Sequence, residues 1–306
     1  MSAPFVVPSP NATAHIALSD GSAIIVRRHG NPDGPRLYFS HGNGFAADAY
    51  FPFWRELLPG FDIVLFDFRN HGWNERSDPA RHRYAQMVHD LDAVVTQAEA
   101  AFGDKPAVGV FHSMSARTAM KHAVELGWRW RALVLFDPPN VPPASHPLYP
   151  AMEIFEQRLV AWAGMRRELF ADPSELAAEY HRSRTSSAWV AGAQELMAQS
   201  VLRKDADGWR LVCAPALEAA IYGEATTLNL WPMASQFGGP TKLIGADPQM
   251  KGGPATGPAN QALGLENGFD YVSVPGTGHL LQIERPEQCL AEMLGFLRQN
   301  DIHPAG

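Results

Sequence analysis

The sequence predicts an α/β fold with a mostly parallel sheet and an inserted helical cap. Short apolar runs alternate along the chain with longer segments of helical periodicity, which is typical of parallel α/β architecture. The earliest strand-like runs are joined by too few residues for crossover helices, so antiparallel hairpins are expected at the N-terminal end. The segment between Pro138 and Pro240 interrupts this alternation.

The expected elements follow one another in a regular order. The strand candidates are AIIVRRHG (23–30), RLYFSHG (36–42), DIVLFDF (62–68), PAVGVF (106–111), RALVLFD (131–137), TKLIGAD (241–247) and FDYVSVPG (269–276). Helical patterns lie between them at residues 48–58, 84–102, 114–126 and 286–300.

The interrupting segment shows helical patterns and no convincing core strand. It is entered through the proline-rich DPPNVPPASHPLYP and left through LWPMASQFGGP. A covering insertion that leaves the sheet after one strand and returns at the next has this appearance. We therefore predict a core of residues 1–138 and 240–306 with a helical cap at 139–239.

The composition excludes several classes of function. The chain has 306 residues, a formal net charge of −7 and no stripe of Lys and Arg, so nucleic-acid binding is not expected. No apolar run is long enough for a membrane span, and the N-terminus lacks the pattern of a secretory signal, which favours a cytoplasmic location. Cys213 and Cys289 lack metal-site spacing and are expected to be buried thiols, so no metal site is predicted.

Four groups of residues stand just after expected strands, at the edge where α/β sheets assemble their chemistry. They are SHGNGF (40–45), Ser113, Asp247, and GTGHLL (276–281) with His279. The order Ser, Asp, His resembles the α/β-hydrolase fold, and DFRNHGWNERS (67–77) is similar to its D-x-R-G-x-G-x-S segment with Asn70 replacing a glycine. The resemblance covers residues 14–300. It implies an eight-stranded, mostly parallel sheet with helices on both faces.

The resemblance implies that Ser113 is a nucleophile and His279 its base, because a serine hydroxyl needs a base to accept its proton. The alternative for Ser113 is an ordinary helix N-cap. The elbow reads FHSMS, so Phe111 and Ser115 replace the glycines of G-x-S-x-G. Phe111 is expected either to project into the core or to shape the pocket wall.

Two aspartates compete for the role of the acid that orients the imidazole. Asp247 follows TKLIGA, the position that the family uses most often, and is the expected partner of His279. Asp137 follows ALVLF at a position used by a minority of the family, and it also fits a simple strand-end turn before proline.

Family resemblance also implies an oxyanion hole formed by the backbone amides of Asn43 and Met114. The cap is rich in aromatic residues, and the expected pocket residues are Phe111, Trp162, Trp189 and Trp231. Arg166 and Arg167 could bind a substrate carboxylate, but solvated cap charges are the expected interpretation.

The function expected from these residues is hydrolysis of a small carboxylic ester by a cofactor-free serine hydrolase. A lactonase or a hydrolase of carbon–carbon bonds would use the same residues, and a ligand receptor could retain the triad with little turnover. The expected partner is a small ester or lactone. The sequence leaves a homo-oligomer open.

Overall fold

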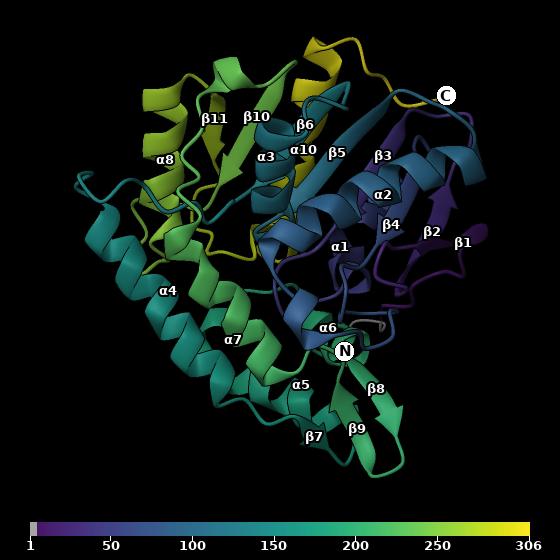
Figure 1. The fold of residues 1–306 in the computed structure, drawn as a ribbon, viewed down its shortest axis with the longest axis vertical. Helices are drawn as coiled ribbons and strands as arrows, with labels where there is room; N and C mark the ends of the chain where they lie inside the picture. The colour runs from purple at the N-terminus through teal and green to yellow at the C-terminus, as the bar shows by residue number, and fades with distance from the viewer. Residues whose placement is uncertain (1–4) are drawn as a thin grey trace.

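A single eight-stranded sheet forms the centre of the molecule (Figure 1). The computed structural model describes residues 5–306. The strands are β1 (Ala12–Ala17), β2 (Ala23–Gly30), β3 (Arg36–Ser40), β4 (Asp62–Phe66), β5 (Ala107–His112), β6 (Ala132–Phe136), β10 (Thr241–Gly245) and β11 (Asp270–Ser273). Their order is β1-β2-β4-β3-β5-β6-β10-β11. β2 runs antiparallel to β1 and β4, and the other neighbours are parallel, which confirms the predicted mostly parallel sheet.

Helices cover both faces of this sheet, as predicted (Figure 1). One face carries α2 (Tyr84–Phe102), α3 (Met114–Glu125) and α8 (Thr256–Asn267), and the other carries α1 (Phe51–Trp54), α9 (Leu281–Glu284) and α10 (Pro286–Gln299). Short 3-10 turns occur at Ala47–Tyr50, Arg55–Leu57, Pro79–Arg81, Arg184–Ser186, Ala225–Thr227 and Ala234–Gln236. Within the part of the chain that the structure describes, none of the helices is both long and apolar enough to cross a membrane.

The central strands are apolar on both sides because both faces are covered. Along β3, Leu37 and Phe39 enter the core under α1 and α10, whereas Tyr38 enters the core under α2 and α3. All residues of β3, β4 and β6 are buried. Their carboxyl ends therefore meet at one rigid edge of the sheet.

The segment between β6 and β10 contributes a layer of its own beyond the carboxyl edge of the sheet (Figure 1). It contains α4 (Tyr149–Gly164), α5 (Pro173–Arg182), α6 (Ala193–Val201) and α7 (Pro215–Glu224), of which α4 and α7 lie side by side. β7 (Leu169–Phe170), β9 (Gly208–Leu211) and β8 (Leu202–Asp205) form a separate small sheet. The division of the chain into core and cap domains stays a prediction.

Two helical regions differ from the sequence-based expectation. The stretch expected as one helix at 48–58 is a short α1 flanked by 3-10 turns. α8 lies in a stretch with glycines, which lower helix propensity, and was not expected. Gly264 is needed there because a Cβ would lie 2.4 Å from Tyr271 Cβ, so the glycine lets α8 approach β11 closely.

Phe111 fills the core beside α2 and α3. Its side chain is fully buried, with its ring centroid 5.4 Å from that of Trp130 and 6.3 Å from that of Phe66. Gly109, two residues earlier on the same face of β5, leaves the space, since a Cβ there would lie 2.5 Å from the Phe111 ring. The expected contribution of Phe111 to a pocket wall is therefore wrong, because this ring lies inside the core.

We predict that Phe111→Ala lowers the free energy of unfolding by about 3–5 kcal/mol, since it leaves a cavity in a closed core. Urea unfolding followed by circular dichroism measures the change. Leu265→Ala is the control, because Leu265 is 74% exposed on α8. A loss for Phe111→Ala no larger than that of the control would contradict the packing described.

Candidate active site

Ser113 stands on a sharp turn between β5 and α3. Its backbone has φ 53° and ψ −115°, a left-handed conformation that costs a residue with a side chain on the order of 1–3 kcal/mol. The turn is held by the Ser113 amide, which donates to Phe136 O at 2.9 Å, and by the Ser115 hydroxyl, which donates to His112 O at 2.9 Å. Ser113 does not act as a side-chain N-cap, because its hydroxyl makes no capping hydrogen bond to α3.

The Ser113 hydroxyl lies against an imidazole. Ser113 Oγ is 2.8 Å from His279 Nε2, and His279 Nδ1 is 2.5 Å from Asp137 Oδ2. The three side chains come from the ends of β5 and β6 and from the loop after β11. Strand ends distant in sequence are brought together here because neighbouring parallel strands finish at the same edge.

The Asp137 carboxylate is fully buried and accepts several hydrogen bonds. Besides His279, it accepts from the Ala246 amide at 2.9 Å, the Thr256 hydroxyl at 2.5 Å and the Asn260 side-chain amide at 2.8 Å. Burial by itself raises the pKa of Asp137, but the hydrogen bonds from His279, Ala246 and Thr256 outweigh it and lower the pKa. The carboxylate is thus kept ionised beside the imidazole.

The expected pairing of Asp247 with His279 is wrong in this geometry. Asp247 Oδ1 accepts from the Gln249 amide at 2.8 Å, and Oδ2 accepts from the Gly276 amide at 2.9 Å. These backbone hydrogen bonds also lower the pKa of Asp247. Asp247 therefore closes a local turn and braces the loop that carries His279, while Asp137 takes the place at the ring.

The glycine loop after β3 packs directly on Ser113. A Cβ on Gly42 would lie 3.1 Å from Ser113 Cβ and 2.9 Å from His112 Nδ1, so only glycine fits there. Gly44 has φ 74°, which turns the chain back. The Met114 amide is the first of α3 and has no intrahelical acceptor. The structure thus keeps Asn43 and Met114 next to Ser113, and their role as oxyanion donors stays a prediction.

A directed chain of hydrogen bonds joins this loop to the loop of His279. The Gly42 amide donates to Tyr50 Oη at 3.1 Å, and Tyr50 Oη lies 2.7 Å from His112 Nδ1. The His279 carbonyl can only accept a hydrogen bond, so His112 Nε2 carries the ring proton and donates to this carbonyl at 2.8 Å, which leaves Nδ1 to accept from the Tyr50 hydroxyl. Burial lowers the pKa of His112 to about 3, which keeps this ring neutral. The sequence suggested no role for His112 or Tyr50.

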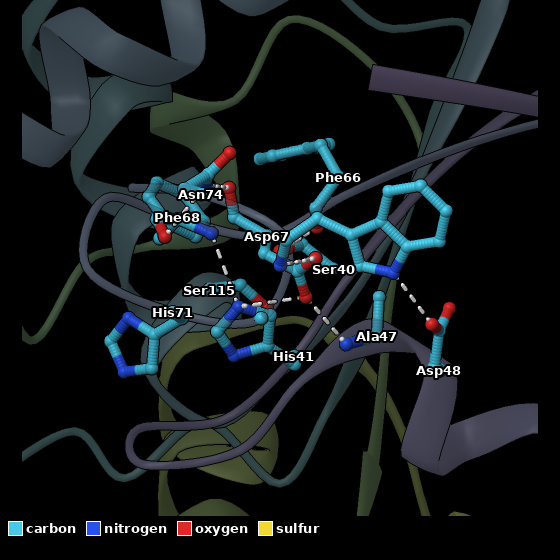
Figure 2. A network of polar contacts seen from close by, with 12 residues as sticks. Ser40, His41, Ala47, Asp48, Phe66, Asp67, Phe68, His71, Asn74 and Ser115 are labelled. Carbon is cyan, nitrogen blue, oxygen red and sulfur yellow. Dashed lines mark hydrogen bonds and ion pairs between the residues drawn. The ribbon is translucent and has the colours of Figure 1, made fainter. Parts of the chain in front are cut away.

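Two further neutral histidines support the loop from the other side. Figure 2 shows the His41 ring between Asp67 and His71. His41 Nε2 accepts from the Phe68 amide at 3.1 Å, so Nδ1 donates to Gly42 O at 2.8 Å. His71 Nε2 accepts from the Gly44 amide at 3.1 Å. Burial lowers the pKa of His41 to about 4, so this support does not depend on a charged ring.

His71, His82 and Cys213 come within 4.8 Å of one another through potential ligand atoms. Their hydrogen bonds do not fit a metal site. Asn70 Oδ1 accepts from the Ser77 amide, so the Asn70 nitrogen faces His82 Nδ1 and leaves the proton of neutral His82 on Nε2. The lone pair of His71 Nε2 is already used by Gly44.

The three tryptophans expected in a pocket contact other side chains of the protein. Trp162 is 46% exposed, and the Arg166 guanidinium lies 5.0 Å from its ring centroid. Trp189 packs against Tyr180, and Trp231 packs against His146. A pocket role for the three tryptophans stays a prediction.

Two buried ion pairs lie in the cap segment and at its contact with α3, and sequence reasoning missed both. Arg166 of the segment after α4 binds Glu218 of α7, and Arg117 of α3 binds Glu156 of α4 at 2.6 Å. All four side chains are nearly or fully buried. The expectation that Arg166 is a solvated cap charge is therefore wrong.

A family model described as the alpha/beta hydrolase family matches residues 37–292. No curated protein matches the sequence significantly. Among solved structures, E-2-(acetamidomethylene)succinate hydrolase is similar, with a TM-score of 0.76 and 20% identity over 94% of this chain and 99% of that one. A malate-bound thermophilic esterase from Thermogutta terrifontis has a TM-score of 0.67 and 17% identity over 94% of this chain and 99% of that one. N-formylmaleamic acid deformylase from Pseudomonas putida has a TM-score of 0.62 and 18% identity over 92% of this chain and 100% of that one. At these identities the likeness concerns the fold.

We predict that Asp137→Asn lowers kcat by about 10⁴-fold, because an amide holds the imidazole in the wrong tautomer. Asp247→Asn should cost less than about tenfold, since it alters a turn away from the ring. Steady-state rates on one activated ester measure both. Circular dichroism of each variant shows whether the fold is kept. If Asp247→Asn lost its activity while Asp137→Asn remained active, the result would contradict the geometry.

We predict that Tyr50→Phe lowers kcat/KM by roughly 10- to 100-fold, because it leaves a buried amide and a buried imidazole nitrogen unpaired, each costing about 1–3 kcal/mol. His112→Asn should be non-additive with it, since both residues belong to one chain of hydrogen bonds. A double-mutant cycle on kcat/KM measures the coupling. Additive effects, or a lowered melting temperature with unchanged kcat/KM, would show that the chain only stabilises the fold.

Proposed function

The chain belongs to the alpha/beta hydrolase family, and we propose that it is a serine hydrolase that cleaves a small carboxylic ester through an acyl-Ser113 intermediate. One observation carries the proposal: Ser113 Oγ, on a strained turn, lies 2.8 Å from His279 Nε2, whose other nitrogen is bound by buried Asp137. A nucleophile, a base within hydrogen-bond reach and a third group that orients the base are the requirements of this chemistry.

In the acylation step, His279 Nε2 accepts the Ser113 proton while Oγ forms a bond to the ester carbon. The carbonyl electron pair moves to oxygen, and the amides of Asn43 and Met114 donate to the oxyanion. Asp137 stabilises the imidazolium without taking its proton. Collapse of the intermediate breaks the ester C–O bond, and His279 returns the proton to the leaving alcohol.

In deacylation, His279 removes a proton from water, which attacks the acyl carbon. The second tetrahedral intermediate expels Ser113 Oγ, which recovers its proton from His279, and the carboxylic acid leaves. Each step uses the same imidazole in alternate directions, so the fixed tautomer imposed by Asp137 is used twice.

The enclosure of the site supports a small substrate. Ser113 is 5% exposed, and the side chain of His279 is 22% exposed. Three similar structures are named for a succinate derivative, a maleamic acid derivative or a bound malate, all compact molecules. A cytoplasmic location and a homo-oligomer stay sequence-based predictions.

We predict that a fluorophosphonate labels the folded protein at Ser113 and abolishes turnover of short-chain esters. The reason is that Ser113 combines a base at 2.8 Å with adjacent backbone donors. Peptide mapping of the labelled protein locates the adduct.

Ser113→Ala should take up no label, and Ser115→Ala is the matched control because Ser115 bonds within the turn. A label elsewhere would overturn the nucleophile. Labelling of Ser113 without multiple turnover of any short ester would favour a receptor that retains the triad.

A further inference from the structure

Two carboxylates hold the backbone of the loop that presents the His279 imidazole. The Gly276 amide donates to Asp247 Oδ2 at 2.9 Å, and the Gly278 amide donates to Glu284 Oε2 at 2.6 Å. Asp247 belongs to the loop after β10, whereas Glu284 is the last residue of α9. Glu284 is 3% exposed, so its hydrogen bond is made away from water. The proposed mechanism does not use this second carboxylate.

The short helix α9 brings Glu284 back to the residue before His279. The Glu284 amide donates to Leu280 O at 3.0 Å, which closes one helical turn. Side chains of a helix tilt toward its N-terminus, so the carboxylate reaches the Gly278 amide, which precedes the helix and has no helical acceptor. A Cβ on Gly278 would lie 3.1 Å from Glu284 Oε1, so the glycine permits this close approach. The carboxylate is therefore bonded to the residue that directly precedes the proposed base.

Buried carboxylates in other parts of the protein are paired with arginine. A buried charge is unfavourable unless an opposite charge and hydrogen bonds compensate it. The buried carboxylates that form ion pairs with arginine are Asp62, Asp67, Asp90, Glu156 and Glu218. Among residues 5–306, the buried carboxylates without an arginine partner are Asp137 and Glu284. Asp137 is bound to the ring of His279, and Glu284 is bound to its loop.

Glu284 has no permanent cation beside its carboxylate in the part of the chain that the structure describes. Arg285, its neighbour in sequence, donates to the main-chain oxygen of Glu284 at 3.1 Å and not to the carboxylate. Burial raises the pKa of Glu284, whereas the hydrogen bond from Gly278 and a positive charge on His279 lower it. The charge that compensates this carboxylate is therefore the imidazolium, which forms when His279 accepts the Ser113 proton.

We propose that Glu284 is a second acid of the site, a positioning residue that holds Gly278 by its hydrogen bond and whose negative charge stabilises the imidazolium of His279. The inference rests on the proposed hydrolase function, because the imidazolium forms as Ser113 attacks the ester. Glu284 transfers no proton in this role. Asp137 fixes the tautomer at the ring, and Glu284 fixes the backbone that carries the ring.

Further ionisable groups interact with His279 or with Glu284, and all of them are buried. They are Asp137 and His112 beside the base, Glu156 of α4 and Cys289 of α10. Burial lowers the pKa of His112 to about 3 and raises the pKa of the Cys289 thiol, so both stay neutral near pH 7. Glu156 has an arginine partner of its own. A change of charge at Glu284 is therefore expected to act mainly on His279.

Glu284→Gln tests the charge, because the glutamine oxygen can still accept from the Gly278 amide. The ring of His279 is titrated by NMR in the Ser113→Ala background, and its signal is identified by its loss in His279→Gln. Two charges about 10 Å apart shift each other's titration by roughly one pH unit at the effective dielectric of buried groups. We expect the midpoint of the ring titration to fall by roughly half a unit to one unit in Glu284→Gln, since the imidazolium loses a stabilising negative charge.

The same substitution in the active enzyme should change the pH profile. The acid limb of kcat/KM reports the protonation of the base in the free enzyme. We expect this limb to move down in Glu284→Gln by the amount found in the ring titration, and kcat to fall about three- to tenfold. Glu287→Gln is the matched control, because Glu287 is exposed in the first turn of α10 and solvent screens its charge. Neither readout should change in the control.

Glu284→Asp separates the charge from the hydrogen bond. The aspartate keeps the charge but is one methylene shorter, so it should lose the contact with Gly278. We expect its melting temperature to fall while the ring midpoint stays at the wild-type value. A midpoint in folded Glu284→Gln that is unchanged or raised would overturn the proposal, because Glu284 would then only brace the loop. A fall of about half a unit or more in Glu284→Asp would overturn it as well, even where Glu284→Gln does not fold.

The ring titration also separates this proposal from the hydrolase proposal, because it requires no turnover. A wild type that hydrolyses no ester, or that takes up no fluorophosphonate, would contradict the hydrolase function and leave the predicted shift to be judged by NMR. An active wild type whose acid limb is the same in Glu284→Gln would contradict only the role of Glu284.

Discussion

The buried Asp137 carboxylate is the interaction on which the rest of the site depends. It accepts hydrogen bonds from Ala246 after β10, from Thr256 and Asn260 of α8, and from His279. A buried charge is tolerated only when it is fully hydrogen-bonded. The four donors come from three separate segments, so the charge is satisfied only when all of them are in place. The tautomer of His279 is therefore coupled to the assembly of the C-terminal half of the sheet.

The glycine loop after β3 and the loop that carries His279 share a second set of constraints. His41, His71 and His112 are all buried, and burial lowers the pKa of each ring. A neutral imidazole has one donor nitrogen and one acceptor nitrogen, so the hydrogen bond to a backbone group determines which nitrogen carries the proton. Tyr50 and His112 then link Gly42 to the His279 carbonyl without any charged group. The proposed oxyanion donors would then need no rearrangement as charge develops, which is the condition for electrostatic catalysis.

The sequence predicted the sheet, Ser113 and His279, because apolar runs mark buried strands and parallel strands end at one edge. It could not choose correctly between Asp137 and Asp247, which follow the adjacent strands β6 and β10. The choice depends on backbone conformation: Asp137 turns inward at φ 41°, whereas Asp247 closes a turn with its own loop. The sequence also could not show whether Phe111 lies in the core or in a pocket wall, because its place in the core depends on the space that Gly109 leaves. Residue types at single positions do not encode either fact.

The cap charges show most clearly what the sequence leaves open. Arg166 and Glu218 are 52 residues apart, and they meet only because α4 and α7 pack side by side. Buried ion pairs are weak evidence for stability, since apolar residues of similar volume often do as well or better. The Arg117–Glu156 pair joins α3 to α4, and the Arg166–Glu218 pair joins the segment after α4 to α7, so the two pairs connect elements that are distant in sequence. Because one fold can serve many substrates, selectivity in such folds is set by the residues around the site and not by the sheet that holds them.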